Sequence, residues 1–155
     1  MNSERRTRIL QTVPMERLSA WVDEVGRLGD VRWIKPARPG LVMMRARETV
    51  RQEEFYVGEI HVCESTVSVD GEWGYGVAMG NQPERADGLA VLDAVFHSSQ
   101  EKWKSLVREI EDWLVAEEAR QEEAWRKEFA LVRRSRVDFE MMDEEDGGLD
   151  GRSTI

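Results

Sequence analysis

A glycine-rich stretch is the first place in this chain where residue types and spacing could do chemistry. Gly71, Gly74 and Gly76 fall within six residues, and backbone N–H groups that no side chain covers can bind a phosphate. The spacing matches neither the dinucleotide fingerprint nor the P-loop, and these glycines fall in a predicted strand instead of a strand-to-helix turn. We therefore expect Gly74 and Gly76 to allow close packing of a helix or a second backbone, and phosphate binding is the less favoured alternative.

Arginines at two places could bind an anion. Arg45 and Arg47 are two residues apart, so on a strand they share a face and could clamp a phosphorylated group or an acidic partner. Glutamates at positions 48, 53 and 54 favour the alternative, a solvated strand end with balanced charge. A second group, Arg136, Asp138 and Phe139 with the arginines before them, either complements a helix dipole or docks a partner, and both interpretations stay open.

Acid/base and nucleophilic catalysis find little support in the sequence. His61 and Cys63 would share a strand face, which makes a Cys/His pair conceivable. A cysteine among apolar strand residues is more often an inert buried thiol, however, and no third group that would orient the histidine can be named. The glutamates near position 120 resemble a charged helix face. We expect no catalytic residue, no cofactor and no metal site in this chain.

Composition sets further limits. The chain has 155 residues, with 31 acidic and 22 basic side chains and a net charge of −9. It is long enough to bury one core, and its acidity argues against nucleic-acid binding through phosphate contacts. Its one cysteine cannot form an internal disulfide, and no apolar run approaches the ~20 residues that cross a bilayer. We expect a cytoplasmic protein that binds neither nucleic acid nor membrane.

An α+β fold must position these residues. Apolar spacing predicts a short helix over residues 3–11 and a second helix from Pro14 to near Gly26 or Gly29. Prolines and a glycine divide the next segment into two short strands, 31–35 and 41–47, which we interpret as a hairpin with an irregular loop.

The strongest hairpin signal follows. Asp70-Gly71 is a turn dipeptide between the β-rich residues 54–69 and the strand 73–77. On that last strand Tyr75 falls on a bulky face, and Gly74 and Gly76 fall on a nearly bare one.

Helices return after the sheet. Pro83 suits a helix start that should pack on the sheet, and a long charged helix is predicted from Gln100. Trp103 begins an apolar seam on this helix, whereas Trp125 lies in a stretch too polar to form a core alone, so we expect a partner chain to cover these aromatic residues. We predict a single α+β domain over residues 1–142, with N-terminal helices, an antiparallel β-meander and C-terminal helices that pack on the sheet and on partner chains, and an acidic, disordered tail over residues 143–155.

Four ordered stretches resemble the G subunit (PhnG) family of the bacterial carbon–phosphorus lyase core complex, which is used in phosphonate metabolism. The resemblance runs along nearly the whole chain, and the ordered set is more specific than any single block. The stretches are Gly40 to Arg47; Phe55 to Glu59; Asp70 to Gly76 with Gly80 to Ala86 and Leu92 to Ala94; and Ser135 to Phe139 followed by Met141.

The resemblance implies a noncatalytic subunit of a large assembly. The expected partners are the H, I and J subunits, with two copies of each subunit, and functionally the L protein. The implied reaction displaces adenine from ATP by methylphosphonate and forms α-D-ribose 1-methylphosphonate 5-triphosphate. The family's nucleosidase chemistry is attributed to the I subunit, and the radical cleavage of the carbon–phosphorus bond, with its iron–sulfur cluster, to the J subunit.

Two other functions remain as alternatives. One is an independent phosphate-ligand-binding domain that uses Arg45, Arg47 and the helix start near Pro83. The other is a homodimeric helical adaptor. The candidate partner or ligand contacts are Arg45, Arg47, Gly74, Tyr75, Gly76, Arg85, Trp103, Trp125, Arg136, Asp138 and Phe139.

Overall fold

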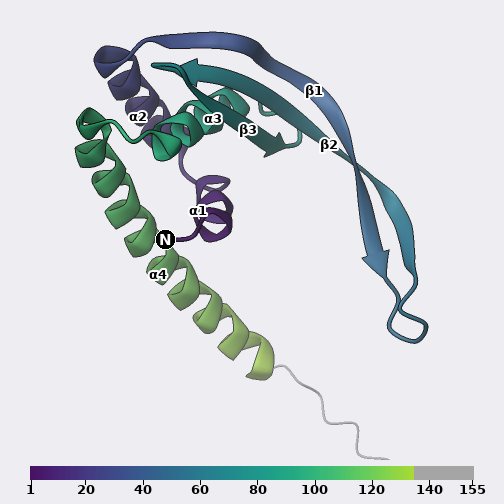
Figure 1. The fold of residues 1–155 in the computed structure, drawn as a ribbon. Helices are drawn as coiled ribbons and strands as arrows, with labels where there is room; N and C mark the ends of the chain where they lie inside the picture. Colours follow the sequence, from purple (N-terminus) through teal and green to yellow (C-terminus); the bar gives the residue numbers. More distant parts are fainter. Residues whose placement is uncertain (135–155) are drawn as a thin grey trace, which may run out of the picture. The chain divides into compact units, whose positions relative to one another are not determined.

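The computed structural model describes residues 1–134 and has the α+β fold that the sequence predicts. Residues 1–120 form one compact unit, and a second unit begins at Gln121, within the last helix. The predicted boundary at residue 142, the acidic tail, and Arg136, Asp138 and Phe139 lie outside the described residues. The elements, in chain order, are α1 (Ser3–Leu10), α2 (Met15–Leu28), β1 (Val31–Arg47), β2 (Glu54–Val69), β3 (Glu72–Met79), α3 (Pro83–His97), the 3-10 turn η1 (Glu101–Trp103) and α4 (Lys104–Arg134) (Figure 1).

The sheet is an antiparallel meander in the order β1-β2-β3, as predicted. Asp70 and Gly71 connect β2 to β3 with φ angles of 51° and 92°, the positive values that tight two-residue hairpin turns require. β3 ends at Met79, opposite Val62, while β1 and β2 continue past it as a two-stranded ribbon (Figure 1). We call residues 41–61, the outer part of this ribbon with its connecting loop, the arm.

β1 corrects one prediction, since the expected hairpin within residues 31–47 is wrong. These residues form a single strand that pairs with β2 from Val31, opposite Val69, to Arg47, opposite Glu54. In the part of the chain that the structure describes, this strand has a neighbour on one side only, so the N–H that Pro36 lacks need not remove a ladder hydrogen bond. The pairing register shifts on both sides of Lys35. The proline segment therefore adds residues to an edge strand and does not reverse the chain.

The helices of residues 1–120 build the core on one face of the sheet. α3 packs across β3 and β2, and α2 meets the first half of α4 through Trp21 and Trp113, whose rings lie edge to face with centroids 5.4 Å apart. The apolar stripes predicted for these helices are buried there. The largest fully buried side chains are Ile9, Val13, Leu18, Val25, Val67, Val69, Val91, Leu92, Val95, Trp103, Ile110 and Leu114.

Two glycines let β3 approach α3 more closely than any side chain would allow. A Cβ atom at Gly74 would lie 2.0 Å from the carbonyl oxygen of Ala90, and one at Gly76 would lie 2.0 Å from that of Ala86. Both contacts are with helix backbone, which cannot move aside as a flexible side chain could. The predicted close packing of a helix on the bare strand face is confirmed.

Glu118 connects the first half of α4 to α1. Its side chain is almost completely buried and accepts hydrogen bonds from the Arg5 Nε atom at 2.6 and 2.7 Å and from an Arg8 guanidinium nitrogen at 3.1 Å. The hydrogen bond from Arg5 is the largest cause that lowers the pKa of Glu118 below 4.5, and burial opposes it. The ionised carboxylate is therefore the form that the fold stabilises.

We expect Glu118→Gln to destabilise the protein at neutral pH and to matter less in acid. Because the folded pKa of Glu118 is depressed, its contribution is complete above the unfolded value of 4.5 and disappears as pH falls through the lower, folded value. Urea unfolding at several pH values should show the two curves converging below about pH 4.5, with Glu109→Gln, exposed on the same helix, as the control. A difference that is the same at every pH would contradict this assignment.

Candidate functional site

The face of the sheet opposite the helices carries large exposed side chains. Trp73, Tyr75 and Met79 alternate with the buried glycines of β3 and point away from α3. Within residues 1–120 no helix lies over this face, which we call the outer face (Figure 1). Gly40 and Met79 are both cross-strand partners of Val62, so they lie on the same face of the sheet. Val42 and Met44 follow Gly40 at two-residue steps, and they therefore continue the outer face onto the arm. A surface of this composition is suited to a protein partner.

The Tyr75 hydroxyl is held in place on the outer face. It donates a hydrogen bond to Glu64 at 3.0 Å, and the Arg38 guanidinium donates two more to the same carboxylate at 3.0 and 2.9 Å. Arg38 and then Tyr75 lower the pKa of Glu64, while burial and the Glu64 carboxylate raise the pKa of Tyr75. Both shifts favour the neutral-pH forms, a charged acid and a protonated phenol. The cluster therefore orients Tyr75 and is poorly suited to proton transfer.

Arg45 and Arg47 lie on the arm and converge on a single carboxylate. An Arg45 nitrogen is 3.1 Å from Glu54 Oε2, and an Arg47 nitrogen is 2.7 Å from Glu54 Oε1. The predicted shared strand face is confirmed by these contacts. The ion pairs favour the balanced strand end over the phosphate clamp, because the guanidinium groups already have an anion to bind.

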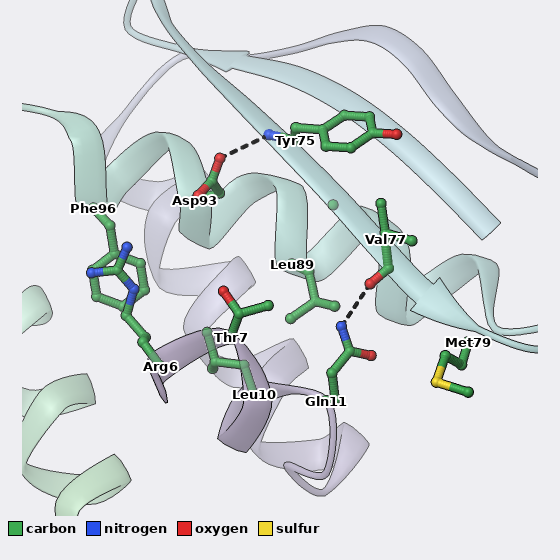
Figure 2. A pocket seen from close by; sticks show the side chains of 11 residues that line it. Arg6, Thr7, Leu10, Gln11, Tyr75, Val77, Met79, Leu89, Asp93 and Phe96 are labelled. Carbon is green, nitrogen blue, oxygen red and sulfur yellow. Dashed lines mark hydrogen bonds between the residues drawn. The ribbon is translucent and has the colours of Figure 1, made fainter. Parts of the chain in front are cut away.

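A hollow of about 450 Å³ lies between α1, α3 and β3 (Figure 2). Arg6 covers one end, with its guanidinium carbon 3.9 Å from the centre of the Phe96 ring. Two polar side chains of the lining are already bonded to the backbone of β3: Gln11 donates to the Val77 carbonyl at 2.7 Å, and Asp93 accepts from the Tyr75 N–H at 3.0 Å. The lining therefore closes the free edge of β3 to another strand.

Arg85 and Trp103 are placed inside the chain's own fold. Arg85 is buried at the start of α3 and donates to the carbonyls of Leu10 and Val13 and to the side chain of Gln82. Trp103 is 1% exposed and belongs to the core. This chain therefore uses both side chains itself, and the helix start at Pro83 does not offer the Arg85 guanidinium to a ligand.

Trp125 lies in the second unit and is exposed. Its ring stacks on that of Phe129, with centroids 5.3 Å apart, and both side chains are at least half exposed. The pair is the kind of aromatic surface for which we expected a partner, and its role remains a prediction.

His61 and Cys63 are not brought together with a third catalytic group. Cys63 is buried in the core, and His61 is exposed at the base of the arm. Over residues 1–134, no three His, Cys, Asp or Glu side chains gather closely enough to hold a metal ion. In the same range, no helix combines the length and the apolar character needed to cross a membrane.

Sequence reasoning missed two aspartates that tie α3 to the sheet. Asp87 accepts hydrogen bonds from the Ser65 hydroxyl at 2.5 Å and from the Ala37 N–H at 3.0 Å, and Asp93 holds the N–H of Tyr75. Both are acidic residues among the apolar residues that make up most of this helix. That break in the apolar pattern was the available signal, since a half-buried carboxylate needs donors.

Comparisons with known proteins point to one family. The family model described as "Phosphonate metabolism protein PhnG" matches residues 2–143. A relative from Rhizobium meliloti (strain 1021), named "Alpha-D-ribose 1-methylphosphonate 5-triphosphate synthase subunit PhnG", is 31% identical over 93 residues, which are 59% of this chain. The chain spans about 60% of the length of this relative.

Proposed function

The chain belongs to the PhnG family of phosphonate metabolism proteins, and from this we propose that it is a noncatalytic subunit of α-D-ribose 1-methylphosphonate 5-triphosphate synthase. In the proposed reaction, a phosphonate oxygen replaces adenine on the ribose of ATP. The partners would be the H, I and J subunits, two copies of each, acting with the L protein in the cytoplasm. The nucleosidase chemistry would belong to the I subunit.

The observation that carries this proposal is the apolar surface that the chain leaves open. The outer face and the arm expose aromatic and aliphatic side chains on an otherwise charged protein. Contiguous apolar surface of this kind marks a protein–protein interface more often than a site for a small polar substrate. A structural role in an assembly therefore fits the surface.

The ionisable groups also favour a noncatalytic role. Three carboxyls among the described residues have a lowered pKa, and each is held by a cation: Glu64 by Arg38, Asp70 by Lys102 and Glu118 by Arg5. A general acid at neutral pH needs a raised pKa, so these shifts run in the wrong direction for one. The paired groups support the fold.

Genetic rescue tests the proposal directly. A bacterial strain that lacks its own G subunit should grow on methylphosphonate as the source of phosphorus when it expresses this chain, and should not grow with an empty vector. Growth of both strains on inorganic phosphate controls for general fitness. No rescue by a chain shown to be folded and abundant in the cells would contradict the assignment.

Calorimetry separates this role from an independent phosphate-binding domain. The isolated chain should bind neither ATP nor methylphosphonate measurably, because Arg45 and Arg47 are neutralised by Glu54 and Arg85 is bonded to backbone carbonyls. Tight binding without partners, abolished by Arg45→Ala, would favour the alternative.

A further inference from the structure

The arm exposes far more apolar surface than its own fold needs. Seven of its large apolar side chains are each between 43% and 64% exposed. At roughly 150–250 Å² for a full aromatic side chain and less for an aliphatic one, together they offer several hundred Å², a large share of the ~800 Å² that each partner contributes to a standard interface. These side chains are Leu41, Val42, Met43, Met44, Phe55, Tyr56 and Val57.

Both faces of the arm are apolar. Cross-strand partners point to the same side, so Leu41 and Met43 share one face with His61 and Glu59, and Val42 and Met44 share the other with Ile60 and Gly58. Beyond the register shift after Met44, Tyr56 and Phe55 again take opposite faces. A ribbon with one solvated side would alternate apolar and polar residues, and this one does not.

Two arginines and two glutamates of the arm have partners within it. Arg45 and Arg47 bind Glu54, and Glu48 accepts from the backbone N–H groups of the loop at the tip. The arm holds three arginines against four glutamates, so it has little net charge with which to attract a partner. A complementary surface would therefore be apolar.

The two edges of the arm are open, whereas the edge of β3 is closed. Gln11 and Asp93 occupy backbone groups on the free edge of β3, which protects it from added strands. Among residues 1–134, β1 pairs on the arm with β2 alone, and β2 pairs with β3 only as far as Val62, where the Gly80 N–H still bonds to the His61 carbonyl. The two prolines of β1 lie before the arm and not in it. The free edge of β3 is therefore blocked, whereas the edges of the arm are protected only by charged side chains and by the register shift after Met44.

From this arrangement we infer that the arm inserts into an apolar cleft of a different protein chain, which covers both of its faces. The inference rests on the proposed function for the source of that chain, another subunit of the synthase. A two-stranded ribbon is marginally stable alone, so the cleft also fixes the position of the arm. The arm then works as the anchor that holds this subunit in the assembly.

Two other occupants fit the arm less well. Edge-to-edge pairing of two copies would extend the sheet but leave both faces of the arm uncovered. A lipid surface would have to receive the tip first, and residues 48–53 are polar except for Val50 and carry two glutamates against one arginine, so their net negative charge is repelled by anionic headgroups. A cleft in a protein is compatible with all three features of the arm, which are its polar tip, its apolar faces and its open edges.

Two matched double variants test the inference in the complex. Leu41→Thr with Met43→Thr changes one face, and Val42→Thr with Met44→Thr changes the other, while threonine keeps a strand-forming side chain. Each should weaken recovery of the chain with co-expressed, tagged H, I and J subunits by at least about ten-fold, as expected when buried apolar contacts are lost. Leu28→Gln, a comparably exposed position on α2, should bind as the wild type does.

The outcomes separate this inference from the proposed function. Unchanged melting of the isolated variants shows that a lost complex reflects lost contact. Normal recovery of either double variant would contradict the inference that a cleft covers both faces of the arm, but it would not contradict the proposed function. Failure of the folded wild-type chain to join the other subunits overturns both. Light scattering adds a last check. If the isolated wild-type chain is a dimer and the arm variants are monomers, the arm binds a second copy of this chain and the inferred cleft in a different protein is wrong.

Discussion

Gly76→Ala is expected to remove a large part of the chain's stability, although it adds a single methyl group. The added Cβ would lie 2.0 Å from the Ala86 carbonyl oxygen and 2.5 Å from the Ala90 nitrogen, both in the backbone of α3. Overpacking a core costs about 1–3 kcal/mol where side chains can adjust, and more where the backbone must move. Since domains of this size have a total stability of about 5–15 kcal/mol, separating α3 from β3 removes a large part of it.

The control for this prediction is another strand glycine. A Cβ at Gly58, on the arm, would meet no atom within 4 Å, and its φ is not positive. Gly58→Ala should therefore melt at or slightly above the wild-type temperature, because alanine loses less backbone entropy on folding. Thermal and urea unfolding followed by circular dichroism make the comparison. Equal unfolding midpoints for the two variants would mean that close packing of β3 on α3 does not depend on the glycines.

The same glycines show what the sequence could predict. Alternation along 73–79 separated a bare strand face from a bulky one, and a bare face favours close approach of another backbone. The Asp70-Gly71 turn fixed the register of β2 against β3 for a similar local reason, since few residues accept positive φ at both positions. Features that depend on local stereochemistry were therefore within reach.

Long-range pairing was not within reach of the sequence. Pro36 and Pro39 look the same whether they end a strand or lie on an edge strand, and only the partner decides between the two. The exposure of Trp73 and Tyr75 likewise depends on which face the helices cover. Local periodicity describes one element at a time, so it could not place the outer face or the arm.

Arg85 illustrates the same limit for a candidate site residue. From the sequence, an arginine in the first turn of a helix that follows Gly80 was a reasonable ligand contact. In the structure its guanidinium donates to the carbonyls of Leu10, at 3.3 Å, and Val13, at 2.9 Å. These carbonyls lie at the end of α1 and in the connection to α2, where no helical N–H follows to satisfy them. Arg85 is more than seventy residues away in the sequence from the Val13 carbonyl that it binds, so no local pattern could predict this contact.

Arg85→Met is the second substitution for which we expect a large loss of stability. Methionine keeps much of the aliphatic volume but donates nothing, so two backbone carbonyls and the Gln82 side chain lose their donor. Leaving a buried polar group unsatisfied costs about 1–3 kcal/mol, and hydrogen bonds to charged groups are at the upper end, so the expected loss is about 2–5 kcal/mol. Urea unfolding of the full chain measures it.

Arg27→Met is the matched control, because Arg27 makes an exposed ion pair with Glu24. Such pairs contribute about 0–1 kcal/mol, so this variant should stay near the wild type. Arg85→Lys should fall between the two, since one ammonium cannot reproduce a planar fork that reaches Val13 and Gln82 together. Equal unfolding midpoints for the two methionine variants would mean that the carbonyls find water instead. The buried hydrogen bonds of Arg85 would then contribute little to the stability of the fold, and the structural role assigned to this side chain would be wrong.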